Sequence, residues 1–337
     1  MRRVIRFTIP PPRAGAALLD FLTARFTYHD RDGWRERIAA GRVTVGGRPA
    51  DPGRRLAAGD ELAYDASDVA EPPVDEAVAI VHADDDLLLA DKPGNLPCHP
   101  GGRYFNHTLW ALLKTRHGIA DPILVNRLDR ETSGLVLIAR HAAAAKNLRA
   151  QFAGRTVAKR YLALVEGAFP ERLDAGGWLD ADYGGPVLKM RRFLPVPDAA
   201  GGAGAARPPA GAAPPSDEAA WAATSFRLLE RRGPLSLVEA QPCTGRLHQI
   251  RATLRALGFP LVGDKMYGHP DAHWLAYTAH LKADGDPRWP GHAAAPRQML
   301  HAATLRCAHP GTSAPLELTA PLPADFLAAV NAAATDT

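Results

Sequence analysis

The spacing of hydrophobic residues divides the first 65 positions into two short helices followed by strands. Residues 17–26 carry leucine and phenylalanine at helical spacing, which predicts a helix with one buried face. Residues 34–40 predict a second helix that ends at Gly41. The stretch RVTVGGRPA contains a strand, a Gly-Gly turn and a returning strand, and LAAGDELAY adds another turn and strand. These patterns predict a small α/β domain over residues 1–65.

A longer region with strand and helix patterns follows an acidic, proline-containing stretch. ASDVAEPPVDE, at residues 66–76, predicts a linker between two domains. Residues 77–330 form the second predicted domain, in which runs such as LVLIA at 135–139 indicate buried strands. Residues 198–216 are almost entirely Ala, Gly and Pro, which cannot bury a core, so we expect a flexible insertion between strands there.

Composition is that of a globular protein. The chain has 337 residues, 46% of them hydrophobic, which is enough for one large domain and a smaller one. Its apolar runs are too short to span a membrane, and its first residues lack the apolar segment of a secretory signal. The three cysteines are widely spaced, which indicates reduced thiols rather than a disulfide framework or a zinc site. We therefore expect a cytoplasmic, monomeric protein.

Positive charge is concentrated near the N-terminus. Residues 1–65 contain twelve arginines, no lysine and eight acidic residues, an excess that accounts for the whole net charge of +4. A small basic domain on a neutral body is typical of a protein that binds phosphate groups. A GC-rich genome that uses arginine for surface charge would produce the same composition, so charge alone leaves both explanations open.

A dense group of charged residues precedes the predicted strand at 135–139. In NRLDRETSGL, residues 126–135, Asp129 lies between Arg127 and Arg130, and the Ser-Gly pair disfavours a helix. A carboxylate between two arginines can be a salt-bridged turn residue or a catalytic group. The segment by itself favours the salt-bridged turn residue.

Two further segments carry candidate chemistry. AKRYLALVEG predicts a strand in which Tyr161, Ala163 and Val165 share one face. TGRLHQIRATLRALG predicts a helix with leucine and isoleucine at helical spacing. Arg251 and Arg255 lie off that apolar stripe, and both phosphate contact and plain surface charge are open for them.

The motifs together resemble a known enzyme family. With DKPGNLPCHPGGRY, RQMLHA and LTAPLP, they resemble the RluA family of pseudouridine synthases in order and spacing over residues 74–330. The pair RLDRETSGL and TGRLHQIR is a strong joint signal. This resemblance implies an α+β fold with a mixed, largely antiparallel central sheet, flanking helices and a site in a cleft across its middle. The domain at 1–65 resembles the ribosomal protein S-four-type RNA-binding domain, whose second helix and following hairpin present basic residues to folded RNA.

The resemblance also implies an activity and a set of site residues. A pseudouridine synthase breaks the bond from C1′ of the sugar to N1 of uracil, turns the base and joins C1′ to C5. Nothing is oxidised, so neither a cofactor nor a metal is expected. A carboxylate must act beside the sugar or the base, and Asp129 matches the family's catalytic aspartate. By the same resemblance, Arg246 keeps this aspartate charged, Tyr161 lies against the uracil, and Arg127 fills the gap that the flipped base leaves in the RNA.

The expected partner is structured RNA, and two RNA classes stay open. An N-terminal RNA-binding domain favours large-subunit ribosomal RNA, whereas HPGGRY followed by Asn106 is similar to the branch that acts on transfer RNA. A non-catalytic RNA-binding or chaperone protein on the same fold is another interpretation, which intact Asp129, Tyr161 and Arg246 disfavour. A serine hydrolase using Ser133 is disfavoured because ETSGL lacks the GxSxG elbow.

Three features extend or depart from the family pattern. The family often has histidine where Asn126 and Thr253 stand, and neither position carries essential chemistry. His82 with the acids at 84–86 could suggest a metal site, but adjacent acids in a hairpin turn point apart and are usually solvated. Residues 269–292, rich in His and Trp, form a second insertion, for which RNA stacking and an ordinary surface loop are both open.

Overall fold

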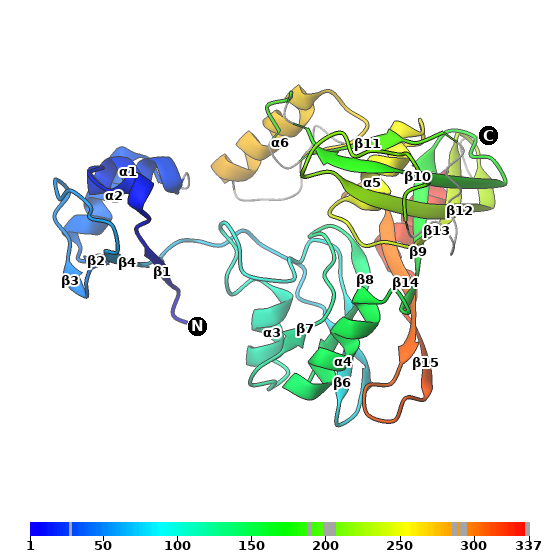
Figure 1. Cartoon of the computed structure of the whole chain (residues 1–337), viewed down its shortest axis with the longest axis horizontal. Coiled ribbons are helices and arrows are strands. Elements are labelled where there is room, and N and C mark those ends of the chain that lie inside the picture. The colour runs from blue at the N-terminus through cyan, green and yellow to red at the C-terminus, as the bar shows by residue number, and fades with distance from the viewer. Residues whose placement is uncertain are drawn as a thin grey trace. The chain divides into compact units, whose positions relative to one another are not determined.

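The chain forms two compact units (Figure 1). The computed structural model describes residues 1–26, 29–182, 184–187, 190–197, 207–284, 289 and 295–333. One unit consists of Met1–Pro72 and Gly101–Asn106, and the other of Pro73–Pro100 and His107–Thr337. The first part of the predicted flexible insertion, residues 198–206, lies outside the described residues. Among those described, no helix has both the length and the apolar character needed to cross a membrane.

The first unit is a four-stranded antiparallel sheet with two α-helices. Its sheet order is β1-β4-β2-β3, and its elements are β1 Val4–Thr8, a short 3-10 helix Pro11–Arg13, α1 Leu18–Arg25, α2 Arg31–Ala39, β2 Val43–Val45, β3 Arg48–Pro49 and β4 Glu61–Asp65. Trp34 and Tyr64 are fully buried, with ring centroids 4.7 Å apart. Asp30 caps α2 by accepting a hydrogen bond from the Gly33 backbone at 2.8 Å. The two helices and the hairpin that hydrophobic spacing predicts are therefore present.

A loop from the middle of the chain, Gly101–Asn106, completes the first unit. Glu71 accepts backbone hydrogen bonds from Phe105 and Asn106 at 2.6 and 2.9 Å, and Arg3 donates to the Gly102 carbonyl. The position of this loop in the sequence predicted that it belongs with the second domain. Long-range hydrogen bonds, which no local pattern reveals, place it in the first.

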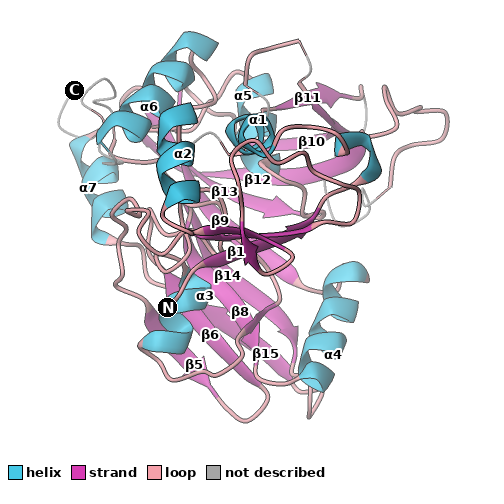
Figure 2. Cartoon of the chain, turned by 90° about the vertical axis from the view of Figure 1, so that its left-hand side faces the viewer, coloured by secondary structure: helices cyan, strands magenta, loops and turns pink. Residues whose placement is uncertain are grey.

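The second unit is built on one large sheet (Figure 2). Its order is β11-β10-β12-β13-β9-β14-β8-β6-β5, with β15 beside β14 and β7 beside β8. The strands are β5 Ala79–Ala83, β6 Leu87–Lys92, β7 Ile123–Leu124, β8 Ser133–Ala139, β9 Ala158–Glu166, β10 Arg172–Ala181, β11 Arg191–Pro195, β12 Ala220–Arg232, β13 Leu235–Pro242, β14 Leu300–Ala308 and β15 Pro315–Thr319. Strands β8 and β14 pair parallel, and the other described pairs are antiparallel. The predicted mixed, largely antiparallel sheet is confirmed.

Helices flank this sheet, as the resemblance implied. They are α3 Leu109–Thr115, α4 Ala142–Ala153, α5 Gln249–Ala256, α6 Asp271–Asp284 and α7 Ala324–Ala332. In β8, Leu135 and Leu137 pack in one apolar cluster with α4, whereas Val136 and Ile138 pack in another with α3. Alternate side chains of a strand point to opposite faces, so β8 is covered on both sides. This explains the uninterrupted apolar run in the sequence.

A glycine sets the approach of β8 to β14 at the centre of the sheet. Gly134 has a φ of +107°, and a Cβ placed on it would lie 2.3 Å from the carbonyl oxygen of Ala302. Any side chain here would force the two strands apart. Because the charged motif leads directly into β8, this close approach fixes the end of that loop.

The turn between β5 and β6 contains the acids considered as a metal site. Ligand atoms of Asp84, Asp86 and His309 lie within 4.8 Å of one another. However, His309 Nδ1 accepts hydrogen bonds from the Gly311 and Thr312 backbone, both at 3.1 Å, so the ring proton is on Nε2. Nε2 donates it to Asp84 at 3.2 Å. A protonated ring nitrogen is not a metal ligand, and the cluster ties this turn to the connection between β14 and β15 by hydrogen bonds.

Candidate active site

The loop between β7 and β8 carries Asp129 and is tied down ahead of it. The Asn126 side chain accepts a hydrogen bond from the Leu137 backbone at 2.7 Å. The Cys98 thiol accepts one from the Leu128 backbone at 3.3 Å. Asn126, which stands where the family often has histidine, thus joins the loop to β8. These contacts restrict the path of the backbone that presents Asp129.

Asp129 is paired with an arginine that a second carboxylate orients. Arg251 Nη1 donates to Asp129 Oδ2 at 2.8 Å. The same guanidinium binds Asp264 through Nε at 2.7 Å and Nη2 at 2.9 Å, a two-point contact that fixes its plane. The side chains of Arg251 and Asp264 are 7% and 0% exposed, whereas Asp129 is 22% exposed. Asp129 is therefore the member of this triad that a substrate can reach.

The prediction that Arg246 is the ionic partner of Asp129 is wrong. Arg246 lies in the turn before α5, is exposed, and donates through Nε to the Trp221 carbonyl at 3.2 Å. Arg251 lies in the first turn of α5. Its place off the apolar stripe leaves phosphate contact and plain surface charge equally open from the sequence. Residues 249–254 of α5 are all buried, so a polar position in this part of the helix is not a surface position, whereas Arg255 in its last turn is exposed.

The charges around Asp129 keep it ionised. Burial raises the pKa of a carboxyl, but Arg251 and its hydrogen bond outweigh this, and the pKa of Asp129 lies below its usual value. His248 Nε2 is 3.9 Å from Asp129, and its Nδ1 is 3.0 Å from the Tyr267 hydroxyl. Burial and the nearby Arg251 charge lower the pKa of His248 to about 4. At neutral pH the site therefore holds an ionised carboxylate beside a neutral imidazole.

Tyr161 of β9 lines the same cavity as Asp129. It packs in one apolar cluster with Ala163 and Val165, which confirms the predicted shared face of the strand. Burial, followed by the charge of Asp129, raises the pKa of Tyr161, so its phenol stays protonated. A neutral aromatic ring beside a carboxylate is a suitable surface for stacking a base.

One cavity brings the predicted residues together. Its lining includes Arg127, Asp129, Tyr161 and Arg246, although these lie as much as 119 positions apart in the sequence. The lining also includes Arg251 and His248, and His248 lies beside Asp129. Sequence reasoning missed His248 and Asp264 as parts of the site. The available signal was their place in the TGRLHQIR and GDKMYG segments that carried the resemblance.

Comparisons with known proteins identify the family of this chain. The family model described as RNA pseudouridylate synthase matches residues 86–256. Ribosomal large subunit pseudouridine synthase D of Pseudomonas aeruginosa is 30% identical, over 94% of this chain and 92% of that protein. The mitochondrial tRNA pseudouridine(32) synthase of Saccharomyces cerevisiae is 29% identical, over 75% of this chain and 51% of that protein. The solved structure of human RNA pseudouridylate synthase domain containing 1 aligns with a TM-score of 0.55 and 26% identity, covering 78% of this chain and 90% of that one.

The fold and the site define an isomerase that acts on RNA, a pseudouridine synthase. The chain belongs to the RNA pseudouridylate synthase family.

Proposed function

We propose that this chain isomerises uridines in large-subunit ribosomal RNA and that Asp129 is its catalytic residue. The observation that carries the catalytic role is the pairing of a partly exposed, ionised Asp129 with a buried Arg251 that Asp264 orients. This arrangement supplies a fixed carboxylate in a cavity that an aromatic side chain, Tyr161, also lines.

An ionised carboxylate suits each route by which the base can be released. Asp129 either attacks C1′ or removes a proton from the sugar, and in both cases the C1′–N1 bond breaks. The freed uracil turns and its C5 bonds to C1′, as the Asp129–C1′ bond breaks in the first route or as Asp129 returns the proton to the sugar in the second. C5 then loses its proton and N1 gains one from solvent. Arg251 stabilises the charged form of Asp129 before the reaction, so no proton has to be removed from the carboxyl first.

Three other residues of the cavity contact the RNA in this proposal. Tyr161 stacks on the flipped uracil, because its ring is the aromatic surface beside Asp129. Arg127 is exposed next to Asp129 and fills the space that the base leaves. Arg246 is also exposed and binds the RNA backbone in this proposal. Its predicted role as the ionic partner of Asp129 belongs to Arg251.

The first unit is proposed to be an S-four-type RNA-binding domain. Its order of two helices, a hairpin and a further strand supports this, as does its excess of arginine. Arg48 directly follows the Gly46-Gly47 turn and is exposed, a suitable position for a phosphate contact. We further propose that the protein acts as a monomer in the cytoplasm, which gel filtration and cell fractionation test.

Coverage of relatives favours ribosomal over transfer RNA. The ribosomal enzyme of P. aeruginosa matches over 94% of this chain and 92% of its own length. The transfer RNA enzyme of yeast matches over 75% of this chain and 51% of its own length. Transfer RNA remains the second candidate because of that relative. Incubating the purified protein separately with unmodified ribosomal RNA fragments and transfer RNA, followed by mapping of pseudouridine, decides between them. Modification confined to transfer RNA would overturn the proposed target, and no release of tritium from C5-labelled uridine in total RNA would indicate a non-catalytic protein.

A further inference from the structure

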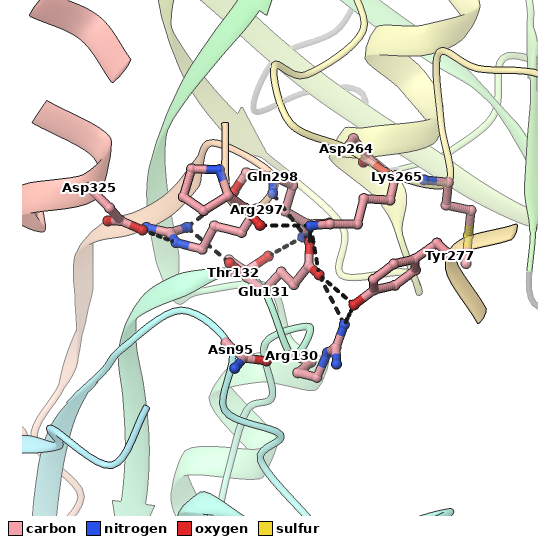
Figure 3. A network of polar contacts seen from close by, with 12 residues as sticks. Asn95, Arg130, Glu131, Thr132, Asp264, Lys265, Tyr277, Arg297, Gln298 and Asp325 are labelled. Carbon is pink, nitrogen blue, oxygen red and sulfur yellow. Dashed lines mark hydrogen bonds and ion pairs between the residues drawn. The ribbon is translucent and has the colours of Figure 1, made fainter. Parts of the chain in front are cut away.

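The residues that follow Asp129 in the chain enter a buried polar network (Figure 3). Glu131 accepts hydrogen bonds from Lys265 Nζ on both carboxylate oxygens, at 3.1 and 3.2 Å, and from Arg130 at 2.9 Å. The Glu131 and Lys265 side chains are 11% and 2% exposed. Arg297 donates to the Glu131 carbonyl at 2.9 Å, so the backbone is restrained as well as the side chain.

The insertion at 269–292 contributes a residue to this network. Tyr277, on α6, is fully buried, and its hydroxyl contacts both Arg130 Nη2 and, at 3.4 Å, Glu131 Oε1. Its ring also lies against two cations, with Lys265 Nζ 5.3 Å and the Arg130 guanidinium 5.9 Å from the ring centroid. Figure 3 shows the ring beside Glu131 and Arg130, with the hydroxyl directed at both. Neither RNA stacking nor an ordinary surface loop describes this residue.

Asp129 and Glu131 are both held by the segment Asp264-Lys265. Asp264 orients Arg251, which pairs with Asp129. Lys265, which follows Asp264 in the chain, pairs with Glu131. The loop is thus attached at Asp129 and again at Glu131 to the same short segment. A displacement of Glu131 would move Asp129 relative to Arg251, because only Arg130 separates the two acids.

We propose that Tyr277 is a positioning residue for catalysis: by fixing Arg130 and Glu131 it sets the place of the Asp129 carboxylate relative to Arg251 and Tyr161. In this proposal, helix α6 restrains the loop that carries Asp129, through the contacts of Tyr277 with Arg130 and Glu131. This inference rests on the proposed catalytic role of Asp129. It also explains why an aromatic insertion contains one fully buried tyrosine whose polar atom faces two charged residues.

The test is Tyr277→Phe, which keeps the ring and removes the hydroxyl. We expect the single-turnover rate at saturating RNA to fall about tenfold, since a hydrogen bond to charged groups is lost, while KM and RNA affinity change less than about twofold. Thr278→Ala is the matched control, because Thr278 is the next residue of α6 and its hydroxyl bonds only the Leu275 carbonyl of the same helix among the hydrogen bonds described. That variant should retain the wild-type rate.

A double-variant cycle and a melting curve separate positioning from other roles. In a Glu131→Gln background, Tyr277→Phe should lower the rate by a smaller factor than in the wild type, because one of the two contacts through which Tyr277 acts is already altered. Full additivity would contradict the proposal, as would a wild-type rate for Tyr277→Phe. A loss of RNA affinity with an unchanged rate would make α6 an RNA contact, and a lower Tm with an unchanged rate per folded enzyme would make Tyr277 purely structural. Asp129→Asn in the same assay keeps the two proposals distinct: activity in that variant overturns the catalytic role, whereas its inactivity together with an unaffected Tyr277→Phe overturns only the positioning.

Discussion

Oppositely charged side chains pair in both units of this protein, but among the described residues the buried pairs lie in the second unit. In the first unit, the pairs Arg31–Asp20 and Arg35–Asp32 have every side chain at least half exposed. In the second, Arg251–Asp264 and Lys265–Glu131 have every side chain at most 11% exposed. Exposed pairs contribute about 1 kcal/mol or less, and water replaces a lost partner. A buried pair that loses one member leaves a charge that nothing else solvates. The same residue types thus form solvated pairs in the first unit and, around Asp129, buried pairs in the second.

The largest effect is expected from removing the charge of Asp129. Asp129→Asn should lower the rate of tritium release at least about a thousandfold, because the amide can neither attack C1′ nor accept a proton from the sugar. RNA affinity should stay within a few-fold, since phosphate contacts dominate binding. Filter binding measured beside the release assay checks both. A rate near that of the wild type would remove Asp129 from its proposed role.

The next effect compares two arginines of one motif. Arg251→Met leaves Asp129 and Asp264 without their shared cation, so we expect a loss of about 3–5 kcal/mol in the free energy of unfolding, measured by urea denaturation. Arg251→Lys keeps the charge but not the two-point contact, and should fold with turnover lowered about a hundredfold.

Arg246→Met is the matched control for both variants. It should keep the stability of the wild type and weaken RNA binding by a few-fold, because Arg246 is exposed. Equal losses of stability for Arg246→Met and Arg251→Met would contradict the ion pair seen in the structure.

The stability of the protein at low pH should depend on the buried carboxylates. The pKa values of Asp129, Glu131 and Asp264 are all lowered in the folded protein, for burial is outweighed by Arg251 or Lys265. The unfolded chain therefore binds protons more readily than the folded one, so the stability that these groups contribute is present above pH of about 4 to 5 and is lost as pH falls through the folded values. The urea midpoint of the wild type should fall more steeply below pH 4.5 than that of Asp264→Asn. Because the pKa of His248 is about 4, the pH–rate profile should show no step near 6.5 from this residue.

A smaller effect is expected at the surface of the first unit. Arg48→Ala should lower the slope of log affinity against log salt by about one unit, as one phosphate contact is lost. The rate at saturating RNA should not change, because Arg48 lies in a different unit from Asp129. Fluorescence anisotropy at several salt concentrations measures the slope, and an unchanged slope would show that this turn does not bind RNA.

The smallest effect belongs to an exposed ion pair. Asp20→Asn removes the partner of Arg31, yet water solvates both groups, so Tm should stay within about 1 °C of the wild type. Differential scanning calorimetry checks this. A shift as large as that caused by Asp264→Asn would erase the distinction between the two units.

Several parts of the site could be predicted because their signals are local. The uninterrupted apolar run after NRLDRETSG indicated a buried strand, and β8 is that strand. Because alternate residues of a strand face the same side, the sequence predicted that Tyr161 shares a face with Ala163 and Val165. The three residues pack in one apolar cluster. Asp129 was found from its charged surroundings together with the family motifs. Each of these depends on neighbours in the chain or on a short repeat.

Local sequence signals could not show whether Arg246 or Arg251 pairs with Asp129. Both are arginines of TGRLHQIR, and helical spacing describes only which residues share a stripe, not what covers the opposite stripe. Asp264 and Asp129 approach Arg251 from segments 13 and 122 positions away. Tyr277 is a similar case, since its partners Arg130 and Glu131 lie 147 and 146 positions away.

The sequence by itself determined the basic first unit and the aspartate that lies among charges, which are properties of short stretches. The family and its largely antiparallel sheet were implied by the resemblance that the motifs carry. Only the tertiary structure decided which arginine meets that aspartate, that Gly101–Asn106 belongs to the first unit, and that α6 buries a tyrosine beside Arg130 and Glu131. The physical reason is that the energy of a charge or a hydroxyl depends on whether water or another part of the chain surrounds it, and that is settled by contacts between distant residues.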